Sequence, residues 1–156
     1  MKEELTYRLA DESDLKEIIK MLSDDKLGSE RENISDELGT DYLKAFRNIK
    51  SDTNQELTVV ELRGEIVATF QLTFIQYLTH QGGLRAQIEA VRTSSKYRGL
   101  GIGNKAITYA INRAKAKNCK IIQLTTDKRR PESIRFYQRM GFHATHEGMK
   151  IYLQYQ

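Results

Sequence analysis

The sequence predicts a mixed α/β domain, because strand-like and helix-like segments alternate along its 156 residues. Two observations carry this prediction. Two β-branched runs, 56–62 and 65–78, flank the turn Arg63-Gly64 and give the clearest hairpin pattern in the chain. The glycine-rich stretch K-Y-R-G-L-G-I-G-N-K-A-I (96–107) stands between a predicted strand and a predicted helix. No repeat, linker or low-complexity tract divides the chain, so residues 1–156 are predicted to form a single domain.

The predicted elements follow the order β-α-α-β-β-β-α-β-α-β-β. Strands are predicted where β-branched and aromatic residues cluster or alternate with polar ones: 5–10, 56–62, 65–78, 84–92, 121–126, 142–146 and 149–155. Helices are predicted where apolar residues recur at helical spacing: 11–22, 41–49, 102–118 and 131–141. Pro131 suits the first position of the last helix, and Gly141 ends it. Residues 24–37 show no firm period and are predicted to form an acidic loop.

The composition indicates a soluble globular protein, with 39% hydrophobic and 29% charged residues. No apolar run approaches the ~20 residues that span a bilayer, and the N-terminal M-K-E-E-L-T-Y lacks the apolar stretch of a signal peptide. The single cysteine, Cys119, excludes an internal disulfide, and no metal-ligand spacing is present. We therefore expect a cytoplasmic protein without a metal or a membrane partner.

Charge is divided unevenly along the chain. Residues 1–50 carry nine Lys and Arg against thirteen Asp and Glu, whereas residues 51–156 carry sixteen against eight. The overall net charge is +4. This division suggests that the two parts face differently charged partners, although an uneven but solvated surface explains it equally well.

Three glycines fall within five residues at 99, 101 and 103, beside Arg98 and between Lys96 and Lys105. Glycines at this density cost backbone entropy, which indicates that bare backbone is needed there. Exposed N–H groups at a helix N-terminus bind anions, so the segment predicts an anion site. The spacing fits neither a nucleotide P-loop nor a dinucleotide fingerprint.

Arg98-Gly99-Leu100-Gly101-Ile102-Gly103 resembles the pyrophosphate loop of the GNAT N-acetyltransferase superfamily, whose pattern is [Q/R]-x-x-G-x-[G/A]. I-E-A-V-R (88–92) is similar to the family's fourth strand, and S-I-R-F-Y-Q-R-M-G-F (133–142) to its last helix. The resemblance covers essentially the whole chain. It implies a mixed, mostly antiparallel α/β (α+β) sheet of about seven strands, flanked by four helices, with a splay between strands four and five.

The resemblance also implies transfer of an acetyl group from acetyl-CoA to a primary amine, by direct attack in a ternary complex. Acetyl-CoA would be held by backbone and side chains of the fourth strand, the glycine loop and the last helix: Val91, Arg92, Arg98, Gly99, Leu100, Gly101, Ile102, Gly103, Arg130 and Ser133. Arg130 stands where the family often has asparagine, and Ser133 where alanine is common. The N–H of Val91 is the candidate oxyanion donor.

Glu89 is the candidate general base, because it precedes Val91 by two residues and should project from the same face of a regular strand. A role limited to binding the substrate ammonium, or a structural ion pair, stays open. Tyr137 matches the family tyrosine that protonates the leaving thiolate. His80 is the alternative base.

Residues that would contact the acceptor are Glu30, Glu32, His80 and His146. The segment 24–37 carries six carboxylates against Lys26 and Arg31, which favours a cationic small-molecule amine. A protein N-terminus or lysine is the alternative acceptor. A non-catalytic CoA sensor or a nucleic-acid-binding module is the alternative of another class; the presence of both Glu89 and Tyr137 argues against the sensor, and no nucleic-acid partner is expected. A homodimer is compatible with the resemblance.

Overall fold

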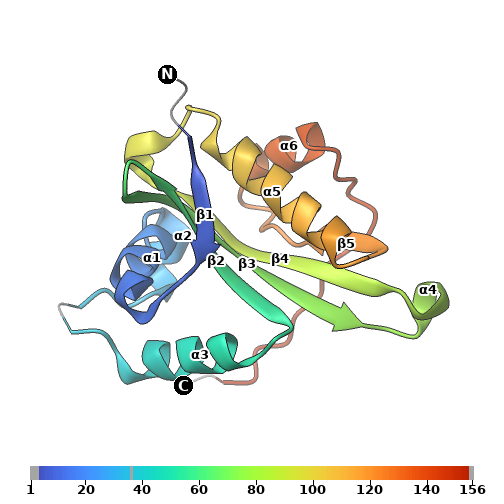
Figure 1. Cartoon of the computed structure of the whole chain (residues 1–156), viewed down its shortest axis with the longest axis horizontal. Coiled ribbons are helices and arrows are strands. Elements are labelled where there is room, and N and C mark those ends of the chain that lie inside the picture. Colours follow the sequence, from blue (N-terminus) through green and yellow to red (C-terminus); the bar gives the residue numbers. More distant parts are fainter. Residues whose placement is uncertain (1–3, 36, 155–156) are drawn as a thin grey trace. The chain divides into compact units, whose positions relative to one another are not determined.

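The computed structural model describes residues 4–35 and 37–154. These residues form five strands and six α-helices (Figure 1), where the sequence predicted about seven strands and four helices. The chain divides into two compact units, Met1–Gln123 and Leu124–Gln156, which are described in turn. No helix of the described residues is long and apolar enough to cross a bilayer.

The first unit is built on a mixed sheet with the strand order β1-β2-β3-β4-β5. The strands are β1 (Thr6–Leu9), β2 (Gln55–Leu62), β3 (Glu65–Gln76), β4 (Leu84–Thr93) and β5 (Ile121–Leu124). Strands β1 to β4 pair antiparallel. The N–H of Lys120 donates to the carbonyl of Leu84 (2.8 Å), and the Gln123 side chain donates to that of Gln87 (2.8 Å). The residue numbers of β4 and β5 rise together, so these two strands run parallel.

Helices cover both faces of this sheet. The helices of the first unit are α1 (Leu15–Leu22), α2 (Lys26–Arg31), α3 (Thr40–Ser51), α4 (Thr79–Gly82) and α5 (Ile102–Ala116), with short 3-10 turns at Glu12–Asp14 and Ser95–Tyr97. On one face, Tyr109 of α5 stacks on Tyr7 at a centroid distance of 4.2 Å and lies 6.2 Å from Phe70. The opposite face packs on α1 and α3, with Ile18, Phe46 and Val59 in one buried cluster. We call these the α5 face and the α1/α3 face.

Helix α2 forms inside the segment that the sequence predicted to be a loop. Asp25 caps it, because its carboxylate accepts the N–H of Gly28 at 2.7 Å. Gly28 is buried, and a Cβ there would stand 2.0 Å from the carbonyl oxygen of Leu22. A residue with a side chain therefore does not fit at this close approach of α2 to the end of α1. Asp36, in the same segment, lies outside the described residues.

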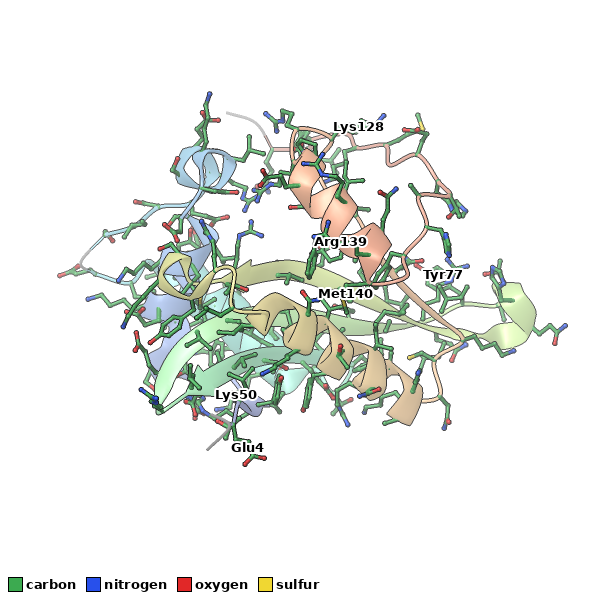
Figure 2. All side chains as sticks on the ribbon, turned by 90° about the horizontal axis from the view of Figure 1, so that it is seen from above. Glu4, Lys50, Tyr77, Lys128, Arg139 and Met140 are labelled. Atoms are coloured by element: carbon green, nitrogen blue, oxygen red, sulfur yellow. The ribbon has the colours of Figure 1, made fainter. Side chains whose placement is uncertain are left out.

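The β3–β4 connection is a left-handed turn rather than a regular helix. His80 and Gln81 have φ values of 53° and 58°, and Gly82 follows at 71°. The ammonium of Lys120 holds the turn by donating to the carbonyls of His80 (3.0 Å) and Gln81 (3.3 Å). Figure 2 shows Tyr77 beside this turn, at the outer end of the hairpin.

The second unit contains one regular element, α6 (Pro131–Arg139), with Pro131 at its first position as predicted. The strands predicted at 142–146 and 149–155 are absent from residues 142–154, and Tyr155 lies outside the described part. A strand exists only where a neighbour accepts its backbone hydrogen bonds, so alternation in the sequence does not form one by itself.

Candidate active site

The glycine loop presents open backbone at the start of α5. Gly99 and Gly101 have φ values of 79° and 76°, which side chains disfavour, and Gly101 is the N-cap of the helix. A Cβ placed on either glycine would meet no other atom within 4 Å. The first N–H groups of a helix have no partner within it, and in α5 these belong to the residues that follow Gly101. The loop thus fits an anion that approaches the backbone closely.

Two of the cations beside the loop, Arg98 and Lys96, contact acids of the first unit. Arg98 Nη2 lies 3.3 Å from Asp24 Oδ2, and Arg98 Nε donates to the carbonyl of Thr93 (3.3 Å). Glu65 accepts the hydroxyl of Tyr97 (2.6 Å) and the ammonium of Lys96 (3.1 Å). These two hydrogen bonds lower the pKa of the Glu65 carboxyl. Lys96 therefore anchors the chain that enters the loop.

Strand β4 contains a bulge beside the predicted oxyanion donor. Thr69 pairs with Arg92 and Gln71 with Glu89, so Ala90 and Val91 together stand opposite a single residue of β3. Ala90 has a φ of 54°, a left-handed conformation that costs about 1–3 kcal/mol for a residue with a side chain. Such strain persists only where the surrounding structure imposes it, and it marks the backbone of Val91 as specially positioned.

The bulge changes which side chains share a face. Thr69 pairs with Val59, which belongs to the buried cluster on the α1/α3 face. Arg92 stands opposite Thr69, and Glu89 stands opposite Gln71 on the same side of the sheet. Arg92 and Glu89 therefore both lie on the α1/α3 face. The expectation that Glu89 shares its face with Val91 was wrong, because the extra residue breaks the two-residue alternation. Arg92 is the neighbour of Glu89 on this face.

A row of hydrogen-bonded polar side chains leads to Glu89. Arg85 donates to Gln123 (3.2 Å), Gln123 to Gln87 (2.8 Å), and Gln87 to Glu89 Oε1 (3.1 Å). Glu89, at the end of the row, is exposed. The sequence analysis missed these partners, although polar residues alternate at 85, 87 and 89 of the predicted strand.

β5 is shorter than its neighbour at this point. Gln123 is level with Gln87, and β5 ends one residue later at Leu124, whereas β4 continues to Thr93. The half of β4 that carries Glu89 and the bulge therefore extends past the end of β5. The splay between the two strands that the resemblance implied stays a prediction.

Most of the described carboxylates in the predicted acceptor segment are engaged within the protein. Tyr42 donates to Glu32 (2.7 Å), and Arg31 Nε lies 2.6 Å from it. Burial acts to raise the pKa of the Glu32 carboxyl, but these hydrogen bonds, with help from the charge of Arg92, lower it below its usual range. Glu30 is exposed. An acidic rim free to attract a cation, which the sequence suggested, is thus only partly present.

The histidines lie apart from Glu89 or in the second unit. His80 stands in the turn that precedes β4. Leu84, the first residue of that strand, is five residues or roughly 16 Å from Glu89 along the strand, and His80 lies beyond it. The structure does not bring it to the bulge. His146 is exposed in the second unit, where its Nδ1 lies 2.7 Å from Thr145 Oγ1.

The remaining predicted residues belong to α6 of the second unit. Tyr137 is half-buried and packs edge to face with Phe136 (5.1 Å) and Phe142 (5.8 Å). Arg130 is the N-cap, and its carbonyl accepts the N–H of Ser133 at 3.1 Å. The F-Y-x-x-x-G-F pattern thus forms an aromatic cluster at the end of this helix.

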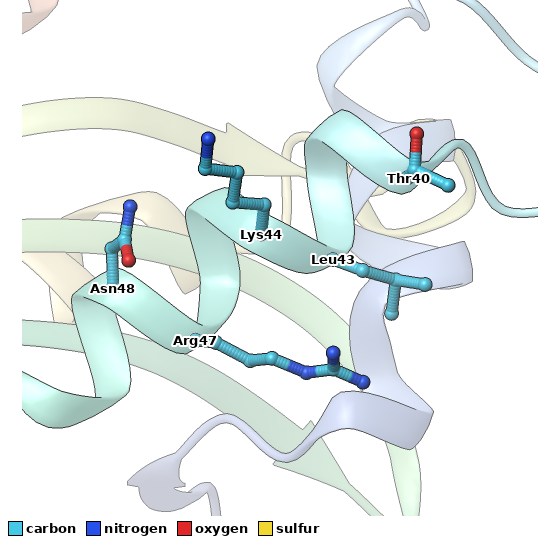
Figure 3. A pocket seen from close by; sticks show the side chains of 5 residues that line it. All are labelled: Thr40, Leu43, Lys44, Arg47 and Asn48. Carbon is cyan, nitrogen blue, oxygen red and sulfur yellow. The ribbon is translucent and has the colours of Figure 1, made fainter.

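Within the part of the chain that the structure describes, neither a metal centre nor a surface pocket on α3 competes with this site. No group of three or more His, Cys, Asp and Glu in the described ranges could hold a metal ion. A pocket on α3 (Figure 3) is lined by Thr40, Leu43, Lys44, Arg47 and Asn48. It contains no carboxylate to accept a proton and none of the predicted site residues.

Comparison with known proteins agrees with this geometry. Residues 15–142 match the model of the acetyltransferase (GNAT) family. A transcriptional regulator from Bacillus halodurans C-125 is 49% identical, with a TM-score of 0.93 over 96% of this chain and all of that one. A putative acetyltransferase from Agrobacterium tumefaciens is 26% identical, with a TM-score of 0.81 over 94% of this chain and 99% of that one.

A predicted acetyltransferase from Clostridium acetobutylicum, solved with acetyl-CoA, is 24% identical and shares the fold (TM-score 0.74, covering 96% of this chain and 97% of that one). The family match spans most of the sequence and includes the glycine loop, the bulged strand and α6. The chain therefore belongs to the acetyltransferase (GNAT) family.

Proposed function

We propose that this protein is an N-acetyltransferase that moves an acetyl group from acetyl-CoA to the primary amine of a small polar molecule. The observation that carries the proposal is the pairing, along one strand and the loop after it, of a strained bulge at Ala90 with open glycine backbone at Gly99 and Gly101. The bulge suits a reacting carbonyl, and the open glycine backbone suits a pyrophosphate.

The cofactor would be held by backbone groups in preference to side chains. N–H groups of residues 99–104 would bind the pyrophosphate at the start of α5, with the guanidinium of Arg98 beside them. The extended half of β4, from Glu89 to Thr93, offers backbone for pairing with the pantetheine arm. Arg130 and Ser133 are proposed as further contacts on the family pattern. Bound acetyl-CoA would supply an activated thioester.

Catalysis then needs three groups of this chain. The Val91 N–H, fixed by the bulge, would stabilise the negative charge that develops on the carbonyl oxygen. Glu89 would accept the ammonium proton through a water, which lets the amine nitrogen form the C–N bond as the C–S bond breaks. The hydroxyl of Tyr137 would give its proton to the departing sulfur.

The polar row supports a hydrophilic acceptor. Glu89 is joined to the amides of Gln87 and Gln123, and Arg92 lies on the same face. Amide and guanidinium groups next to the base suit an amine that carries hydroxyl, amide or acidic groups, and they penalise an apolar amine that would leave them unsatisfied. Glu30, which is exposed, would add attraction for a cation.

The deciding experiment measures thiol release from acetyl-CoA with a panel of amines. The panel contains an amino sugar, a polyamine, an amino acid, an arylalkylamine and peptides with a free N-terminus or a single lysine. We expect release with hydrophilic small amines and none with the arylalkylamine. Thiol release with peptides alone would show that the acceptor is a protein and not a small molecule. Absence of both thiol release and acetyl-CoA binding would refute the proposed function.

A second candidate function follows from the relative described as a transcriptional regulator, since it is 49% identical over nearly the whole chain. The excess of sixteen Lys and Arg over eight Asp and Glu in residues 51–156 is compatible with a polyanion partner. Binding of duplex DNA at two salt concentrations tests it. Sequence-selective binding that survives physiological salt would establish a regulatory role, and weak binding that disappears with salt would exclude it.

A further inference from the structure

Arg85 is fixed at the start of β4 by contacts with the β3–β4 connection. Its guanidinium lies over the ring of Tyr77, 4.6 Å from the ring centroid. Arg85 Nη2 also donates to the hydroxyl oxygen of Thr79 at 3.2 Å. The ammonium of Lys120 holds the same connection through two of its carbonyl groups. The connection therefore sets the position of the Arg85 guanidinium, which belongs to a residue four positions, or roughly 13 Å, before Glu89 along the strand.

The hydrogen bonds that lead from Arg85 to Glu89 all run in one direction. Arg85 Nη1 donates to Gln123 Oε1 (3.2 Å), and Gln123 Nε2 donates to Gln87 Oε1 (2.8 Å). Gln87 Nε2 then donates to Glu89 Oε1 (3.1 Å). A guanidinium has only donors and an ionised carboxylate has only acceptors, whereas an amide has an oxygen on one side and an NH2 group on the other. The two charged ends of the row therefore dictate which way both amides face.

This orientation determines how the Glu89 carboxylate is held. An amide N–H reaches Oε1, and a hydrogen bond to an ionised acceptor is stronger than one between neutral groups. Reversal of the Gln87 amide would place its carbonyl oxygen against the carboxylate, which repels it. Oε1 is thus anchored to the sheet, and Oε2 is the oxygen that can be directed at a proton.

We propose that Arg85, Gln123 and Gln87 are positioning residues that orient the Glu89 carboxylate, so that Oε2 receives the amine proton through a water. The proposal rests on the proposed function, in which Glu89 is the general base. The β3–β4 connection would thereby act on the reaction at a distance, since it holds Arg85 and Arg85 orients the two amides. A base held in one orientation needs no reordering when the acceptor binds, so the row acts on kcat and not on KM.

The first test compares Arg85→Met with Arg85→Lys by steady-state kinetics, using the amine of the panel with the highest wild-type rate. Methionine keeps an unbranched side chain but removes the donor, so kcat should fall roughly 10-fold with KM for the acceptor unchanged. Lysine still supplies donors and no acceptor, so Arg85→Lys should recover most of the rate. Arg47→Met, on α3 and outside the row, removes the same charge and should keep the wild-type kcat. A higher KM with unchanged kcat in Arg85→Met would overturn the proposal, because the row would then bind the acceptor.

Gln123→Glu tests the direction of the row while the side-chain shape stays the same. A carboxylate at this position accepts from Arg85 more strongly than an amide does, so the variant should fold at least as well as the wild type, which circular dichroism checks. It has no N–H to donate, so Gln87 should turn its NH2 group away from Glu89 and towards the new carboxylate. We expect kcat to fall at least as far as in Arg85→Met. A folded Gln123→Glu protein with wild-type kcat would show that the direction of the row is irrelevant, and the proposal would be wrong.

Nuclear magnetic resonance of the side-chain amides tests the row independently of activity. The NH2 signals of Gln87 and Gln123 should shift together in Arg85→Met and again in Glu89→Ala, because each change removes one charged end of the row. The NH2 signal of Gln55, on β2 and outside the row, is the internal control and should not shift. If no amine releases thiol from acetyl-CoA, the proposed function fails. Coupled shifts would still establish the oriented row in that case, and shifts confined to the glutamine beside each change would overturn it.

Discussion

In the sequence, the glycine loop at 98–104 and the acidic segment at 24–37 are both candidate ligand-binding segments. In the structure, the polar groups of the two segments have different surroundings. In the loop, Gly99 and Gly101 have open space where a side chain would stand, beside the N-terminus of α5. In the acidic segment, Asp24 meets Arg98, Asp25 caps α2, and Glu32 accepts Tyr42. The first region keeps its polar groups for a ligand, whereas the second uses most of its charges to hold itself in place.

This difference means that the sequence locates a site built from backbone N–H groups better than a site built from carboxylates. Backbone donors cannot be neutralised by a neighbouring side chain without filling the space that the glycines leave. Carboxylates are readily taken up by nearby Arg, Tyr and N–H groups. We therefore expect substitutions in the loop to have large effects on acetyl-CoA binding, and substitutions in the acidic segment to have small ones.

Gly101→Glu should have the largest effect. Its φ of 76° disfavours any side chain, and a carboxylate there would occupy the space in front of the α5 N-terminus. We expect acetyl-CoA binding to fall below detection by calorimetry. Gly82→Glu, at a φ of 71° in the β3–β4 turn at the other end of β4, controls for backbone strain and should bind normally. A folded Gly101→Glu protein with unchanged affinity would exclude the loop as the pyrophosphate site.

Tyr137→Phe tests the proposed acid in the second unit. It removes one hydroxyl and keeps the ring that packs on Phe136 and Phe142, so the aromatic cluster should survive. We expect kcat to fall by roughly 10²–10⁴-fold with acetyl-CoA affinity unchanged. The measurement is steady-state kinetics beside calorimetry on the same preparation. A kcat within a factor of about three of wild type would remove Tyr137 from the mechanism.

Glu89→Gln separates proton acceptance from substrate attraction. If Glu89 takes the proton, kcat should fall by roughly 10²-fold, and high pH should restore part of it by supplying neutral amine, whose pKa is near ~10. If the carboxylate only attracts the ammonium, KM for the acceptor should rise with kcat little changed. As a control, Gln87→Glu is added to Glu89→Gln, which puts a carboxylate one step back along the polar row. This second change should not restore kcat.

The sequence predicted what is set locally and missed what long-range pairing decides. Gly64 and the β-branched runs around it gave the hairpin, and Pro131 gave the start of α6, because turn and cap chemistry act within a few residues. The bulge at Ala90 could not be foreseen, since it depends on the register of β3 against β4. The face of Glu89 was therefore assigned wrongly, and its partners Gln87 and Gln123 were overlooked.

The acidic segment shows the same limit. Its lack of helical period hid α2, which is short and depends on the cap of Asp25 and on the close approach at Gly28. The prediction of the two terminal strands was wrong for the converse reason. Apolar and polar residues alternate clearly in these segments, but the sequence of a segment does not specify which strand it pairs with. Local pattern specifies which conformation a segment prefers, and the rest of the fold decides whether a neighbour is present.

Asp24→Asn should have the smallest effect and tests the contact between the two regions. The carboxylate lies 3.3 Å from Arg98 Nη2, so it competes with a pyrophosphate for the same guanidinium and adds a like charge near it. Both groups are exposed, with 51% of the Arg98 and 39% of the Asp24 side chain accessible, and exposed ion pairs contribute only about 0.2–1 kcal/mol. Loss of the carboxylate should therefore tighten acetyl-CoA binding by roughly 2–5-fold. Asp25→Asn is the matched control, because it removes the same charge from the next residue while asparagine still caps α2. Calorimetry at low and at physiological salt decides between them: equal tightening in both variants would mean that general charge, and not the contact with Arg98, governs the affinity.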